Sequence, residues 1–184
     1  MNRTEFIKSN MKGKVLDVGC SCGTLHSLIS NKNVYGLDIE DCGNIKENFY
    51  IGDAQGMPFD DNFFDTVVAG ELIEHLENPE KFLTEAKRVL KKDGILIIST
   101  PNKKSLVNRI FRTYYRHHIS LFDAYSLKKL LSKYFTIEKM FFLPYDEVSD
   151  WGCRFKWLYW PRRLLHIFLP QNLQEDMIIK SVKK

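Results

Sequence analysis

The sequence has little cysteine and proline and contains no long apolar run. Its four cysteines form neither a spaced disulfide framework nor a pair of Cys-x-x-Cys knuckles, so neither a disulfide-rich secreted fold nor a zinc site is indicated. Neither a secretory signal nor a membrane-spanning stretch is recognisable, and we therefore expect a reduced, cytoplasmic setting. The net charge of +4 permits contact with an acidic partner but does not indicate one.

The remaining composition is that of a single globular domain. With 184 residues, of which 44% are hydrophobic and 27% charged, the chain is long enough for one sizeable core and short for two. We expect one domain over residues 1–184, with a core formed by residues 12–143 and 176–184. Residues 144–175 form an aromatic and basic insertion between the two parts of the core.

One glycine-containing stretch, Val15-Leu-Asp-Val-Gly-Cys-Ser-Cys-Gly23, organises the chain. Its β-favouring start, glycine turn and following apolar pattern predict a strand, a tight loop and a helix. Glycine lets the backbone lie close to a ligand, and an acid two residues before the first glycine repels phosphate and suits a cation. The loop residues that we expect to contact a ligand are Asp17, Gly19, Cys20, Ser21 and Gly23.

Acidic residues recur at the ends of the next expected strands. Val34–Asp38 ends in an acid about twenty residues after the glycine loop, and Phe49–Asp53 ends in another. In an open parallel sheet these positions lie at the carboxyl edge, where a carboxylate can accept both hydroxyls of a ribose. Asp38 therefore indicates a nucleoside cofactor, although a solvated aspartate at a strand end would give the same sequence.

Strand and helix patterns alternate along the rest of the chain, which predicts an α/β doubly wound sheet. Buried strands are expected where apolar runs are bounded by turn residues, and helices where apolar residues recur with helical spacing. The remaining expected elements are strands at residues 64–70, 95–100, 134–143 and 176–182, and helices that start at residue 79 and span residues 124–131.

These features resemble the class I S-adenosylmethionine-dependent methyltransferases, in particular the small-molecule branch that includes the ubiquinone-pathway O-methyltransferases. The family's first motif is acid-x-Gly-x-Gly-x-Gly, and the chain has Ser21 in place of the middle glycine. The pattern Gly-Asp53-Ala54 and the sequence Glu-His75-Leu before an Asn-Pro helix extend the resemblance over residues 12–102. The resemblance implies a Rossmann-like, seven-stranded sheet that is mostly parallel and has a C-terminal antiparallel strand.

The resemblance also implies a contact for each part of S-adenosylmethionine. The first loop would hold the methionine end, Asp38 the ribose and Asp53 the adenine, while Gly70 and Glu71 would line the gap between sulfonium and acceptor. The complete set of expected cofactor contacts is Asp17, Gly19, Cys20, Ser21, Gly23, Asp38, Ile39, Asp53, Ala54, Gly70 and Glu71.

Two histidines, His75 and His118, are candidates for a catalytic base, because imidazole can take a proton near neutral pH. Either could instead be a structural residue. On a helix, Glu71, Glu74 and His75 would share one face. They match a Glu-x-x-Glu-His cluster at which ubiquinone-pathway enzymes can bind a divalent metal, and oxygen ligands would suit Mg²⁺. We assign no metal from this pattern.

Two stretches of basic and aromatic residues are compatible with more than one role. Residues 103–118 contain no acid and suit a solvated cationic helix face or, less readily, a nucleic-acid contact. Residues 151–169 of the insertion carry too many charges to span a membrane. They suit a substrate lid, a peripheral membrane contact, a homodimer interface or a cover for the edge of the sheet.

The sequence thus predicts an enzyme that transfers a methyl group in line to an oxygen or nitrogen of a small molecule, with apolar or lipid-linked acceptors among the candidates. An RNA-directed methyltransferase is one alternative, although Ala-Gly-Glu-Leu stands where base-amine methylating enzymes carry Asn or Asp before two prolines and an aromatic. A non-catalytic cofactor-binding module with a protein partner is a second alternative. NAD-linked oxidoreduction is a third, disfavoured by the spacing of the glycine loop.

Overall fold

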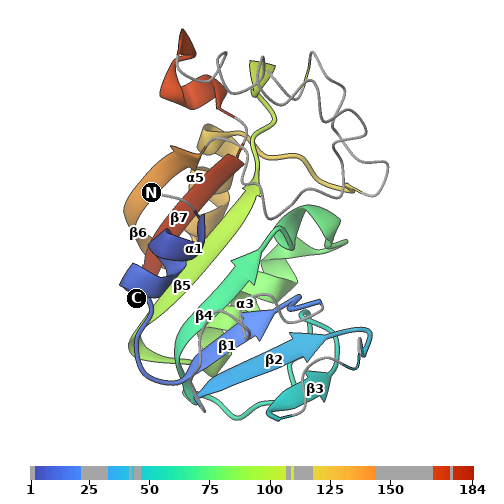
Figure 1. Cartoon of the computed structure of the whole chain (residues 1–184). Helices are drawn as coiled ribbons and strands as arrows, with labels where there is room; N and C mark the ends of the chain where they lie inside the picture. Colours follow the sequence, from blue (N-terminus) through green and yellow to red (C-terminus); the bar gives the residue numbers. More distant parts are fainter. Residues whose placement is uncertain are drawn as a thin grey trace.

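The computed structural model describes residues 3–21, 33–41, 43, 47–106, 109, 118–143, 168–174 and 176–184. These residues form a seven-stranded sheet with the order β3-β2-β1-β4-β5-β7-β6 (Figure 1). The strands are β1 (Val15–Val18), β2 (Val34–Asp38), β3 (Phe49–Ile51), β4 (Phe64–Gly70), β5 (Leu90–Pro101), β6 (Phe135–Leu143) and β7 (Asp176–Lys183). β7 is antiparallel to β5 and β6, and the other neighbouring strands are parallel. The predicted doubly wound sheet with a C-terminal antiparallel strand is confirmed.

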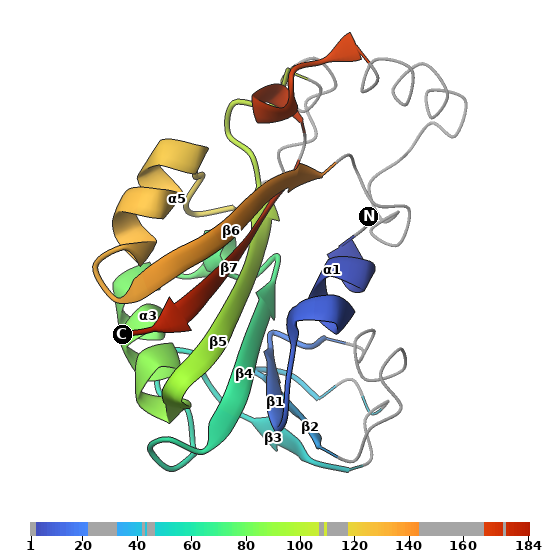
Figure 2. The ribbon, with the colours of Figure 1, turned by 90° about the vertical axis from the view of Figure 1, so that its left-hand side faces the viewer.

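Helices cover both faces of the sheet (Figure 2). α1 (Arg3–Asn10) packs on one face, and α3 (Pro79–Val89) and α5 (Ala124–Leu131) pack on the other. Strand side chains alternate between the two faces. The core under α1 includes Phe6, Ile7, Val15, Val68 and Ile97, and the core under α3 and α5 includes Leu16, Val67, Leu96, Phe82 and Leu127. Because both faces are covered, the central strands read as nearly continuous apolar runs.

Local sequence signals start α3 and α5. The side chain of Asn78 accepts a hydrogen bond from the Lys81 amide at 3.0 Å, and Pro79 occupies the first turn of α3. Asp123 caps α5 reciprocally, because its carboxylate accepts the Ser126 amide at 2.8 Å while its own amide donates to the Ser126 hydroxyl at 3.0 Å. The second cap fixes the end of the loop that follows residue 118.

Most predicted boundaries agree with the structure, and two differ for identifiable reasons. The predicted elements that coincide with observed ones are residues 34–38 (β2), 64–70 (β4) and 124–131 (α5). β3 ends at Ile51 instead of Asp53, because the Asp53 carboxylate accepts the amide two positions later at 2.8 Å and closes a turn. β5 begins at Leu90 instead of Ile95, because the expected turn is a bulge within the strand, with Asp93 at φ +58°.

Some predictions fall on residues outside the described ranges. They include Gly23, most of residues 103–118 beyond position 106, and residues 144–167 of the insertion. The suggested lid, membrane and dimer roles of residues 151–169 therefore stay predictions. Among the helices of the described ranges, none is long and apolar enough to cross a membrane.

Candidate functional site

The chain turns sharply after β1 at Gly19, whose φ of +71° lies in the left-handed region that glycine tolerates. The Gly19 amide donates to the Leu37 carbonyl in β2 at 2.8 Å, which fixes the turn against the neighbouring strand. A Cβ at this position would lie 2.9 Å from Cδ1 of Leu72, so a side chain here would require Leu72 to shift. Cys20 is buried, and Ser21 continues the turn with φ +46°. The predicted strand and tight loop are confirmed as far as Ser21.

Asp17 lies in β1 just before this turn, and its side chain is almost completely buried. Burial is the main reason why the pKa of Asp17 is raised to about 7. The charge of Asp38 raises this pKa further, whereas the guanidinium of Arg3 lowers it. A buried acid that titrates near neutrality gains its charge readily when a cation binds beside it, so this position suits a positively charged ligand group.

Asp38, at the end of β2, forms a hydrogen bond to the turn that follows β1. Oδ2 of Asp38 accepts the Ser21 amide at 2.7 Å, and Oδ1 accepts the Glu40 amide at 3.3 Å. The next side chain, Ile39, is 70% exposed. An open apolar side chain beside a carboxylate offers a nucleoside a surface for its ring and an acceptor for its hydroxyls.

Asp53 and Ala54 follow β3, the next strand in the sheet. Ala54 is buried, whereas Asp53 is exposed and its Oδ1 accepts the Gln55 amide at 2.8 Å. The sheet order therefore brings the ends of β1, β2 and β3 side by side, with Asp17 inside β1, Asp38 as the last residue of β2 and Asp53 two residues after β3.

The chain leaves β4 through Gly70 and Glu71, and this turn corrects one prediction. Glu71 has φ +52°, and its amide donates to a backbone carbonyl of β5 at 3.0 Å. The 3-10 helix η1 that follows comprises only Ile73–His75. The prediction that Glu71 shares a helical face with Glu74 and His75 is therefore wrong, because a left-handed residue separates the strand from the helix.

Arg3 of α1 contributes a cation that the sequence analysis missed. Its Nη1 lies 3.3 Å from Oε1 of Glu71, and its charge opposes the raised pKa of Asp17. Burial also raises the pKa of Glu71. The buried side chains Phe6 and Ile7 hold α1 against the sheet, and this tertiary packing brings Arg3 to Glu71. No local sequence signal shows where α1 packs.

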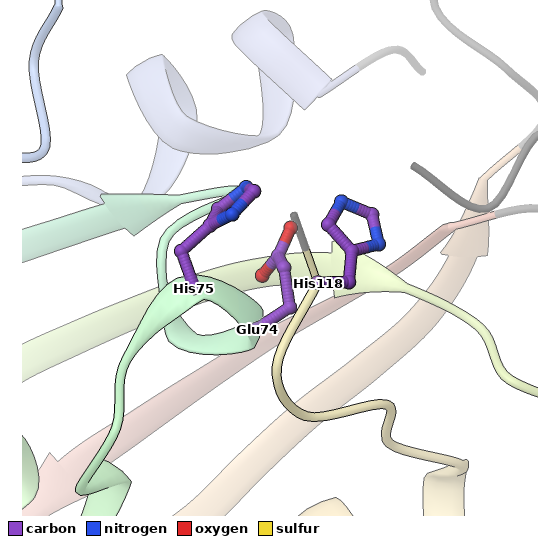
Figure 3. Close-up of side chains that lie close together, drawn as sticks. All are labelled: Glu74, His75 and His118. Carbon is purple, nitrogen blue, oxygen red and sulfur yellow. The ribbon is translucent and has the colours of Figure 1, made fainter. Parts of the chain in front are cut away.

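Glu74, His75 and His118 gather beyond the end of β4 (Figure 3). One potential ligand atom from each lies within 4.8 Å of the others, and the two imidazole centroids are 4.8 Å apart with an interplanar angle of 75°. Glu74 is fully buried, and its Oε2 accepts a hydrogen bond from the Thr100 hydroxyl at 2.9 Å. Burial raises the pKa of Glu74 to about 8, and the charge of Glu71 adds to this effect. The two predicted base candidates thus lie side by side, although the sequence did not link them.

Comparisons with known proteins agree with this fold. Residues 16–98 match the family model described as a methyltransferase domain. An uncharacterised protein of Methanocaldococcus jannaschii is 37% identical over 97 residues, which cover 50% of this chain and 43% of that protein. The ubiquinone biosynthesis O-methyltransferase of Maricaulis maris is 30% identical over 107 residues, which cover 50% of this chain and 42% of that protein. The matches thus span less than half the length of these two relatives.

A solved structure of an S-adenosylmethionine-dependent methyltransferase from Archaeoglobus fulgidus has the same fold. It superposes with a TM-score of 0.71 over 98% of this chain and 91% of that chain, at 22% identity. Residues 16–98 therefore match a methyltransferase domain, and the chain has the fold of S-adenosylmethionine-dependent methyltransferases. S-adenosylmethionine is the cofactor of that class of enzyme.

Proposed function

We propose that this chain transfers the methyl group of S-adenosylmethionine to an oxygen or nitrogen of a small molecule and leaves S-adenosylhomocysteine. One observation carries the proposal: three neighbouring strand ends present Asp17, Asp38 and Asp53 around a glycine turn. The strand order reverses between β1 and β4, beside Asp17 of β1. Ligands of open α/β sheets bind in the crevice at such a point.

These carboxylates match the cationic and hydroxylated parts of the cofactor. Asp17 and the glycine turn would face the methionine end, where the ammonium and sulfonium are positive. Asp38 would accept the ribose hydroxyls, since the 3.3 Å bond that its Oδ1 accepts from a neighbouring amide is long and replaceable. Ile39 would cover one face of the adenine, with Asp53 at its amino group and Ala54 beside its ring.

The methionine end of the cofactor also carries a carboxylate, which the surrounding acids repel. Arg3 is a guanidinium at this position, already paired with Glu71 at 3.3 Å. A guanidinium has five donors and can serve two carboxylates at once. We therefore include Arg3 among the proposed cofactor contacts.

Methyl transfer from a sulfonium is an in-line displacement, so the protein mainly positions the two reactants and excludes water. Gly70 and Glu71 would line the gap between them. His75 is the last residue of η1 and His118 lies beside it (Figure 3), so an acceptor that approaches here would meet both imidazoles. Without a bound cation there, either imidazole can take the acceptor's proton.

A small acceptor is supported by the relatives, one of which is named for ubiquinone biosynthesis. An apolar or lipid-linked acceptor stays a candidate within this class. The RNA-directed and non-catalytic alternatives stay predictions, as do the cytoplasmic location, the homodimer and the membrane contact through residues 151–169.

The test is calorimetric titration of the full chain with S-adenosylhomocysteine and S-adenosylmethionine, together with a transfer assay over a panel of small hydroxyl and amine acceptors. Asp38→Ala should weaken binding of both compounds by about tenfold, since two ribose hydrogen bonds are lost. Asp41→Ala is the matched control, because Asp41 is an exposed aspartate close to Asp38 in sequence whose carboxylate accepts only a local amide, that of Gly43 at 2.7 Å. Equal affinities for the wild type and the Asp38 variant would remove the ribose assignment.

A further inference from the structure

The structure assembles a set of metal ligands that no single sequence motif contains. Glu74 and His75 come from η1, and His118 comes from the loop before α5. In Figure 3 the carboxyl group of Glu74 lies between the two imidazole rings. Potential ligand atoms of the three residues lie within 4.8 Å of one another, and ligands around one ion with bonds of about 2.1 Å lie between 3 and 4 Å apart. Small side-chain rotations would therefore close the set around one cation.

An independent observation concerns one carboxylate oxygen of Glu74. The residue is 0% exposed, and its Oε1 has no hydrogen-bond partner among the described residues. A buried carboxylate oxygen normally accepts a hydrogen bond or coordinates a cation, since leaving it without either is costly. The other oxygen, Oε2, is held by the Thr100 hydroxyl at 2.9 Å, which orients the carboxylate.

The backbone holds the two segments of the set together. The amides of Ile119 and Ser120 donate to the Glu74 carbonyl at 2.9 and 3.0 Å, so the loop with His118 is tied directly to η1. The same loop is tied to the end of β5, where the Lys103 amide donates to the Phe122 carbonyl at 2.8 Å. Binding a cation would therefore need little rearrangement of the backbone.

We propose that Glu74, His75 and His118 bind one divalent cation of the zinc type. Two imidazole nitrogens and one carboxylate oxygen suit zinc, cobalt or iron better than magnesium, which prefers oxygen ligands. Three protein ligands leave a coordination position open for a further group. Glu71 is outside this set, because its side chain pairs with Arg3 at 3.3 Å. The set therefore differs, in one ligand and in metal class, from the Glu71, Glu74 and His75 cluster that the resemblance implies.

The role of the cation rests on the proposed function, whereas its binding does not. The open position lies beside the proposed acceptor, where a divalent cation would lower the pKa of a coordinated hydroxyl and so release its proton to solvent. In that state the two imidazoles act as ligands instead of bases.

The experiment uses the full chain, treated with a chelator and then titrated with Co²⁺, whose visible absorption reports nitrogen and oxygen ligands, followed by displacement with Zn²⁺. We expect one Co²⁺ per chain and an absorption band that Zn²⁺ abolishes. Glu74→Gln and His118→Ala should each weaken Co²⁺ binding by about 100-fold, because one of three ligands is lost. Glu71→Gln is the matched control and should leave the affinity within about threefold.

His118→Gln replaces His118→Ala if the smaller side chain prevents folding, and far-UV circular dichroism checks every variant. Absence of Co²⁺ and Zn²⁺ binding by the folded wild type would overturn the proposal. So would a loss of binding in Glu71→Gln with retention in His118→Ala, since the cation would then sit on the other cluster. Affinity for S-adenosylhomocysteine with and without chelator is measured on the same samples, so failure of the cation site and failure of the cofactor site are distinguishable.

Discussion

The two halves of the site are built in different ways. On the cofactor side, each predicted contact stands at the end of a strand, and the strands β1, β2 and β3 are consecutive in both the chain and the sheet. On the acceptor side, Glu74 and His75 of η1 and His118 of the loop before α5 come from two distant segments that meet only after folding. Local sequence patterns therefore position the cofactor half of the site, whereas tertiary packing assembles the acceptor half.

The acids of the site are satisfied in two ways. Asp38 and Asp53 accept backbone amides from the turns beside them. Asp17 and Glu74 are buried and Glu71 is half-buried. The pKa values of all three are raised, and the charge of Arg3 lowers the pKa of each. A cationic ligand would stabilise such a site, because its positive charge replaces the hydration that these carboxylates lose when the chain folds.

The largest expected effect is the pH dependence caused by Asp17. Its folded pKa of about 7 lies above the ordinary value, so the folded state holds the proton more tightly than the unfolded state. The contribution of Asp17 to stability is therefore greatest at low pH and is lost as the pH rises through about 7. Between pH 5 and pH 8 the free energy of unfolding of the wild type should fall by about 3 kcal/mol relative to Asp17→Asn, measured by urea denaturation. Asp60→Asn, an exposed aspartate, serves as control, and parallel curves for wild type and Asp17→Asn would refute the assignment.

The next effect separates backbone strain from steric clash in the glycine turn. Gly19→Ala should destabilise the protein by about 2 kcal/mol, because it adds both a left-handed alanine and a contact with Leu72. Gly43→Ala should cost only about 1 kcal/mol, since Gly43 has a similar φ of +68° and no described residue lies within 4 Å of its Cβ position. Equal unfolding free energies for the two variants would show that the contact with Leu72 does not matter.

A third variant perturbs the acceptor half alone. Thr100→Val keeps the shape of the side chain but removes the donor to buried Glu74, so we expect a destabilisation of about 1.5 kcal/mol and slower methyl transfer. Affinity for S-adenosylhomocysteine should stay within about threefold, because the cofactor half is untouched. Thr84→Val on the exposed face of α3 is the control. A large loss of cofactor affinity in Thr100→Val would mean that the two halves are not separate.

The smallest effect concerns Arg3. Arg3→Ala should weaken S-adenosylhomocysteine binding by about tenfold, or about 1.4 kcal/mol, because the cofactor carboxylate loses its partner. Binding of methylthioadenosine, which lacks the amino acid portion, should not change. Arg3→Lys should restore part of the loss. A similar loss for both ligands would assign Arg3 a structural role instead.

The sequence predicted the cofactor half well because its signals are local. Strand ends, the glycine turn and the acid spacing all fall within short stretches, and the structure places Gly19 and Ser21 in the predicted turn. The end of β3 was misjudged because an aspartate that can follow a strand can also close a turn. The start of β5 was misjudged because a bulge and a turn share the same Asp-Gly signal.

The acceptor half was predicted in its members but not in its arrangement. Glu71, Glu74 and His75 have helical spacing, yet the left-handed Glu71 breaks the helix before it begins. That break sends Glu71 towards Arg3 and leaves room for His118 beside Glu74, a pairing of segments that no local pattern encodes. Arg3, a proposed cofactor contact, was also missed, because α1 reaches Glu71 only through tertiary packing.

The central claim is that the ends of the first three strands hold a sulfonium nucleoside, and direct calorimetry of the purified full chain with S-adenosylmethionine tests it most directly. The account predicts one site per chain, with protons released on binding near pH 7 as Asp17 becomes charged, so the measured heat should change with the ionisation enthalpy of the buffer. A folded chain that takes up neither S-adenosylmethionine nor S-adenosylhomocysteine would contradict it.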